Sequence, residues 1–169
     1  MNKYLAVLSV AVLVGCVPQP KTLTIATPYS DDDFAAWDGA GPATIQGQAF
    51  LKTVGGDVKT CAGHDVILLP ATKYNIEIMS NYEIYKSKIN YTNRDIRADY
   101  RIRKSMCDAQ GRFVFNDVPA LNWYISTNVT WGVATRYGIE YQGGHLRKMF
   151  TIRPGINDII MSDKDLKDR

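Results

Sequence analysis

Histidine is scarce in this chain of 169 residues, which has two, His64 and His145. Neither is followed by the partners of a zinc peptidase motif such as His-Glu-x-x-His, and no Gly-x-Ser-x-Gly segment offers a serine nucleophile. A nucleophilic triad needs a base with a partner of its own, which isolated loop histidines do not supply. The sequence therefore predicts a protein that is not an enzyme and that holds no metal or dissociable cofactor.

A strong charge of either sign is also missing. The chain has 20 Lys and Arg against 17 Asp and Glu, a formal net charge of +3. The basic residues between Arg94 and Lys104 alternate with Tyr100, Ile102 and aspartates, which is typical of a solvated face rather than of a phosphate-binding patch. We therefore expect no nucleic-acid partner.

No apolar run is long enough to span a bilayer. The run that begins at Tyr4 has about 11 residues, whereas a spanning helix needs about 20. It follows the cationic Lys3 and ends in Leu13-Val14-Gly15-Cys16, which resembles the lipobox of bacterial lipoproteins. That resemblance implies that residues 1–15 are a lipoprotein signal peptide and that Cys16 carries a covalent lipid. An ordinary secretory signal with a chance cysteine is the alternative.

The lipoprotein resemblance also implies a location. Val17, not aspartate, follows the lipidated cysteine, which in enterobacteria-like organisms favours the outer membrane, facing the periplasm. The partner would then be the membrane itself, reached through the lipid. Residues 16–42 hold several prolines and the acidic triplet 31–33, so we expect a tether there. We expect Phe34 and Trp37, within it, to pack on the domain edge.

Cysteine is limited to three residues, and two remain once Cys16 is lipidated. In an oxidising compartment Cys61 and Cys107 are the possible intramolecular pair, and we predict a disulfide between them. Two separately buried thiols are the competing interpretation.

The rest of the mature chain predicts one mostly β domain over residues 43–162. Alternating apolar positions predict strands at 43–52 and 65–69 and over 123–131, with a helix from Thr72, its N-cap, to Ile89. The helix carries a tyrosine-rich face that should pack on the sheet rather than bind a ligand. We further expect hairpins at 100–118 and 146–161, a loop through Gly138, Gly143 and Gly144, and a loose charged tail at 163–169.

Two sheets of such strands would bury one apolar layer between them. The expected core residues are Ile45, Ala49, Val66, Leu68, Phe113, Phe115, Ile125, Val129, Phe150 and Ile159. The segments Gly47-Gln-Ala-Phe50, Val66-Ile-Leu-Leu-Pro-Ala-Thr72 and Asp108-Ala-Gln-Gly-Arg-Phe-Val-Phe115 resemble the carboxypeptidase regulatory-like, or transthyretin-like, family. The resemblance implies a prealbumin-like, seven-stranded β-sandwich, here with one inserted helix.

Function is less defined than fold, because that family serves many functions. Exposed Trp131, Tyr137 and Tyr141 near a glycine-rich segment could hold a peptide, a glycan or an envelope protein, or could merely cover the end of the sheet. We therefore expect a non-catalytic binding or structural module of the envelope. The alternatives are a transthyretin-related hydrolase, drawing on His64, His145 and Arg147, or the lipoprotein subunit of a secretion complex.

Overall fold

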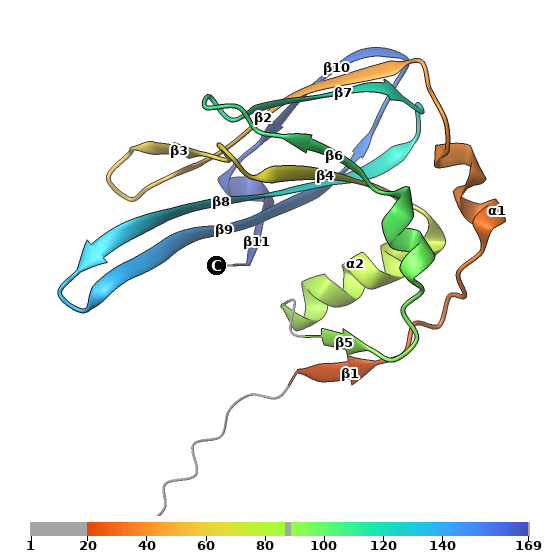
Figure 1. Ribbon diagram of the computed structural model, residues 1–169, viewed down its shortest axis with the longest axis horizontal. Helices are drawn as coiled ribbons and strands as arrows, with labels where there is room; N and C mark the ends of the chain where they lie inside the picture. Colours follow the sequence, from red (N-terminus) through yellow and green to blue (C-terminus); the bar gives the residue numbers. More distant parts are fainter. Residues whose placement is uncertain (1–19, 87–88, 169) are drawn as a thin grey trace, which may run out of the picture.

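The computed structural model describes residues 20–86 and 89–168. The predicted signal peptide and Cys16 lie outside these residues. Two β-sheets face each other across one core, and a smaller unit built around a helix lies beside them (Figure 1). The predicted mostly β sandwich is therefore confirmed at the level of architecture. No helix in the described part of the chain is long and apolar enough to cross a membrane.

The first sheet is centred on β2 (Ala43–Lys52), the strand predicted at those residues. On one side β2 pairs in parallel with β10 (Gly155–Met161). On the other side it pairs antiparallel with β7 (Arg112–Val118) and, near its end, with β3 (Val58–Thr60).

The second sheet has the order β11-β9-β8-β4-β6, with all neighbours antiparallel. Its strands are β4 (Asp65–Pro70), β6 (Arg103–Met106), β8 (Asn122–Thr135), β9 (Gly138–Thr151) and β11 (Leu166–Asp168). Among the described residues the two sheets have four and five strands, which is more than the seven strands expected. The short strands β3 and β11 pair at sheet edges. Each has only three residues, which is too short for an alternating pattern to predict a strand.

The predicted core forms. Nine of the ten residues are buried, and Phe150 is partly buried against the same cluster. Trp123 lies among them with no exposed surface, and its indole donates a hydrogen bond to the Pro119 carbonyl at 2.9 Å. The predicted disulfide is confirmed: Cys61 and Cys107 are joined, with Cα atoms 5.7 Å apart, and both are buried.

The inserted helix is α2 (Lys73–Tyr85), and Thr72 is its N-cap, accepting a hydrogen bond from the Asn75 amide. It ends earlier than predicted because Lys86 adopts a left-handed conformation, which places Ile89 in the next strand. The buried part of the predicted face, Tyr74 and Ile78, belongs to a second core instead of packing in the sandwich.

Two predicted hairpins are wrong. The Asp108–Gly111 turn exists, with the Arg112 amide donating to the Asp108 carboxylate at 2.8 Å, but β6 and β7 on either side of it belong to different sheets. The same holds for β9 and β10 around Pro154. Alternation predicts that a segment is a strand, but it does not predict which strand it pairs with.

The predicted loop through Gly138, Gly143 and Gly144 is wrong as well. These glycines lie in β9, which runs unbroken beside β8 from Gly138↔Thr135 to Thr151↔Asn122. The resulting hairpin reaches farther than the other strands of its sheet (Figure 1). The tail is not loose either: η3 (Asp163–Asp165) and β11 close the sheet edge, and Leu166 packs against the core.

The segment expected to be a tether is folded onto the domain from residue 21 onward. β1 (Lys21–Leu23) pairs in parallel with β5 (Ile89–Tyr91), and α1 (Asp31–Phe34) and η1 (Ala35–Trp37) follow it. Ile25 and Phe34 are buried in the second core. Phe34 and Trp37 thus pack on the domain as predicted, and the Trp37 indole donates to the Asn122 carbonyl at 2.9 Å. Apolar residues that are sparse and irregularly spaced can still fill a core. The lack of apolar periodicity in residues 16–42 therefore wrongly predicted a tether.

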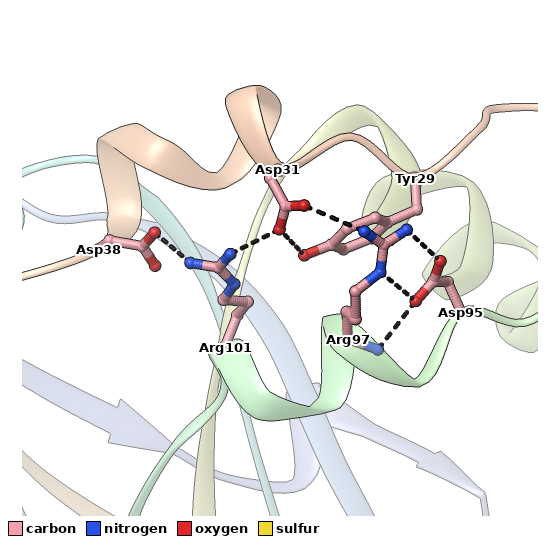
Figure 2. Close-up of polar contacts among 6 residues, drawn as sticks. All are labelled: Tyr29, Asp31, Asp38, Asp95, Arg97 and Arg101. Carbon is pink, nitrogen blue, oxygen red and sulfur yellow. Dashed lines mark hydrogen bonds and ion pairs between the residues drawn. The ribbon is translucent and has the colours of Figure 1, made fainter.

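Ion pairs tie this N-terminal segment, residues 21–38, to η2 (Ile96–Arg101), as Figure 2 shows. Arg97 contacts Asp31 at 3.1 Å and Asp95 at 2.8 Å. Arg101 contacts Asp31 at 2.7 Å and also pairs with Asp38. The hydrogen bonds from Tyr29 and Arg101 lower the pKa of Asp31, and the bond from Arg97 lowers the pKa of Asp95. Each of the three carboxylates is paired with an arginine of the cluster, which indicates a structural role.

Acid is expected to loosen the N-terminal segment. The Glu77 carboxylate accepts the amides of Ala26 and Thr27 at 2.7 and 2.8 Å, and hydrogen bonds from Thr27 and Ala26 lower the pKa of Glu77 from 4.5. A lowered folded-state pKa stabilises the fold above the unfolded value and loses that contribution as pH falls through the folded value. The protection factors of the Ala26 and Thr27 amides, which compare the observed exchange rate with the intrinsic rate at the same pH, should therefore fall below about pH 4.5.

The matched control is Glu77→Gln, which should loosen these amides at neutral pH and flatten their response to acid. Protection factors that stay unchanged down to about pH 3 in the wild type would contradict the role given to the Glu77 carboxylate.

Candidate functional site

A pocket of about 170 Å³ lies at the base of the β8–β9 hairpin. It is lined by Leu51, Lys52, Thr53, Val54, Trp131, Tyr141, Gln142, Gly143, Asp163 and Leu166. We call it the aromatic pocket. Many ligand sites measure roughly 300–1,000 Å³, so this one suits a single ring or side chain of a ligand that extends beyond it.

Trp131 forms one wall because of the strand that carries it. It continues the inward-facing row of β8 after Ile125 and Val129, and its ring packs against the sandwich core while remaining partly exposed. Its cross-strand partner is Gln142, which also lines the pocket. Tyr141 adds a second ring and is 76 % exposed. The ring of Trp131 is thus held by the fold, whereas that of Tyr141 is free to adapt.

Polar groups enter the pocket from elements distant in sequence. Lys52 is the last residue of β2, Thr53 follows it, and Asp163 comes from η3. The Asp163 carboxylate accepts a hydrogen bond from the Lys52 amide at 3.3 Å, which fixes the tail against β2. The pocket therefore combines two aromatic faces with hydrogen-bond donors and acceptors.

The three aromatic residues singled out from the sequence separate in the structure. Trp131 and Tyr141 line one pocket, whereas Tyr137 lies in the hairpin turn with 90 % of its surface exposed and is not part of it. Lys52 and Asp163 were missed because they lie in a strand end and in a tail expected to be loose. No spacing rule links them to residue 131, so only the tertiary fold brings them there.

The two histidines each bond to a β8 side chain. His64 contacts the Thr130 hydroxyl at 3.2 Å, and His145 contacts the Asn128 side chain at 2.9 Å. Arg147, the third member of the hydrolase alternative, is buried. Within residues 20–86 and 89–168 no group of three or more His, Cys, Asp or Glu is placed to hold a metal ion.

Gly143 is the residue that makes room for Trp131. Its φ is +100°, and a Cβ there would lie 2.0 Å from the Val129 carbonyl oxygen and 2.8 Å from Trp131 Cζ3. Gly143→Ala should therefore displace the indole and lower the melting temperature. Gly138→Ala is the control, because Gly138 also has a positive φ, +129°, but nothing lies within 4 Å of its added Cβ.

Near-ultraviolet circular dichroism should change in Gly143→Ala and stay close to wild type in Gly138→Ala. Equal spectra for both variants would show that Trp131 does not rest on Gly143.

Comparison with known proteins supports the fold. No family model matches the chain, and no curated protein matches it. A solved structure from Pseudomonas aeruginosa, described as a proposed carbohydrate binding protein, is similar with a TM-score of 0.66 and 23% sequence identity. The alignment covers 80% of this chain and 98% of that one. The likeness establishes a shared sandwich fold over most of the domain.

Proposed function

We propose that this chain is a lipid-anchored, non-catalytic module of the cell envelope that binds a glycan in the aromatic pocket. The observation that carries the proposal is the meeting of Trp131 and Tyr141 with Lys52, Gln142 and Asp163 in one hollow. The C–H faces of a sugar ring pack on aromatic rings, while its hydroxyls need nearby donors and acceptors. The pocket offers both.

Two further lines support the proposal. The Pseudomonas aeruginosa protein of the same fold is described as a proposed carbohydrate binding protein. The sequence segments around Gly47, Val66 and Asp108 resemble carboxypeptidase regulatory-like, transthyretin-like sandwiches, and we propose this chain as a divergent member of that group. Leu13-Val14-Gly15-Cys16 and Val17 support anchoring in the outer membrane, facing the periplasm.

A panel of soluble oligosaccharides tests the binding claim. The wild-type protein should retain at least one of the glucan, chitin-type and uronic-acid oligosaccharides in affinity electrophoresis, and Trp131→Ala should abolish that retention. Loss of a fully engaged aromatic ring commonly costs 2 kcal/mol or more, about a 30-fold weaker affinity.

Tyr137→Ala is the matched control, because Tyr137 lies on the same hairpin but outside the pocket. Retention lost equally in both variants would move the site to the hairpin turn. A different outcome is that no oligosaccharide binds but an envelope peptide does, and that Trp131→Ala abolishes the peptide binding. The aromatic pocket would then be a binding site, and its assignment to glycans would be wrong.

A further inference from the structure

Arg147 is a buried cation with unused hydrogen-bond donors. It lies in β9 opposite Ser126 and exposes 5% of its surface. Its guanidinium carbon is 5.7 Å from the centre of the Tyr82 ring, on α2. Nε and Nη2 are both buried and have no hydrogen-bond partner among the residues that the structure describes.

These two nitrogens are a matched pair. Arginine stays protonated in proteins, so burying it without an acceptor is unfavourable. Nε–H and Nη2–H lie along one edge of the planar guanidinium and point in the same direction. Two parallel donors at that spacing fit the two oxygens of a carboxylate. The unused edge of Arg147 is therefore shaped for an oxyanion.

A second pocket, of about 320 Å³, lies beside Tyr82, the residue whose ring contacts Arg147. Its lining residues are Tyr82, Glu83, Lys86, Leu166 and Lys167, and we call it the cationic pocket. Tyr82 both lines it and covers the Arg147 guanidinium. Glu83 is engaged with Lys167 at 3.0 Å, so the acidic residue of the pocket is paired with a lysine rather than with Arg147.

Leu166 lines the aromatic pocket and the cationic pocket alike, so both pockets border the edge strand β11. We propose that the cationic pocket and Arg147 form a carboxylate subsite, and that the ligand is an acidic glycan carrying a uronic-acid residue. The inference rests on the proposed glycan binding. A neutral ring would pack on Trp131, and the glycan would pass the edge strand β11 to the other face of the sheet, because Trp131 and Arg147 lie on opposite faces of the β8–β9 pair. There the carboxylate of a residue farther along the glycan, after the Tyr82 side chain turns aside, accepts from Nε and Nη2 of Arg147.

Free glucuronate tests the subsite alone. Isothermal titration at matched ionic strength should show binding of sodium glucuronate to the wild type and at least tenfold weaker binding to Arg147→Met, the scale of a lost charged hydrogen-bond pair. Arg147→Lys should be weakened similarly, because lysine keeps the charge but not the paired edge. Arg153→Met is the control, since it removes an exposed arginine outside both pockets.

Stability separates this proposal from a structural role. Without ligand, Arg147→Met should melt at or above the wild-type temperature, because it removes a buried charge that has no acceptor. Glu83→Gln should bind glucuronate more tightly, because a repelling carboxylate is gone. A markedly lower melting temperature or failure to fold in Arg147→Met would show that Arg147 has an internal partner and would overturn the proposal.

Glycan binding in the aromatic pocket and carboxylate binding at Arg147 can be tested independently of each other. Trp131→Ala should leave free glucuronate binding unchanged while it abolishes oligosaccharide retention. Binding of inorganic phosphate without binding of glucuronate would overturn the acidic-sugar assignment. Oligosaccharide binding that is lost in Trp131→Ala but equal for neutral and acidic chains would leave the aromatic pocket intact and remove the carboxylate subsite.

Discussion

Replacing Cys61 and Cys107 together by alanine should lower the free energy of unfolding by about 4 kcal/mol, from the entropy of the unfolded loop that the disulfide closes. The bridge joins residues 46 apart in sequence and fixes β3 and the β6–β7 turn to one another. For a domain of this size the melting temperature should fall by roughly 8–16 °C.

The control for this experiment is reductant. A strong reductant should lower the melting temperature of the wild type toward that of the double variant and leave the double variant unchanged. A double variant that melts within about 2 °C of the wild type would mean that the unfolded loop is already constrained by other means.

Cys16→Ser should move the protein from the membrane fraction to the soluble fraction or arrest it as an unprocessed precursor. Several acyl chains at about 0.8 kcal/mol per buried methylene hold a domain far more firmly than one chain does. Intact mass of the wild type should give a chain that begins at Cys16 with a lipid-sized increment. A soluble wild-type product cut elsewhere would contradict the anchor.

The folded N-terminal segment would limit how far a lipid on Cys16 lets the domain move from the membrane. β1 begins at Lys21, five residues after Cys16. At about 3.6 Å per residue, a lipid on Cys16 would hold β1 within about 18 Å of the acylated residue. The domain would thus sit close to the membrane instead of standing off on a long tether.

Local features of the fold were predictable from the sequence. The ten-residue alternation of β2, the Thr72 cap of α2 and the turn at Asp108 each depend on neighbours in the chain, and each is present as predicted. The disulfide followed from the cysteine count and the expected compartment. The pairing of β10 with β2 in parallel was not predictable, because it depends on contacts between residues more than 100 apart.

In the candidate site, too, some residues were predictable from the sequence and others depend on the tertiary fold. Trp131 and Tyr141 were predicted because exposed aromatic residues near glycines stand out in a sequence. Asp163 was missed because its position depends on the tail folding back against β2. Arg147 was considered only beside the histidines, and its burial beneath Tyr82 became visible with α2 in place.

The most direct test of the central claim is the indole N–H signal of each tryptophan in a nitrogen–proton correlation spectrum, recorded while a bound oligosaccharide is added. Trp37 and Trp123 serve as internal references, because their indoles donate to the Asn122 and Pro119 carbonyls at 2.9 Å. Glycan binding in the aromatic pocket predicts that the Trp131 signal shifts with saturation while the other two stay in place. A shift at Trp37 or Trp123 with Trp131 unmoved would place the ligand elsewhere and contradict the account.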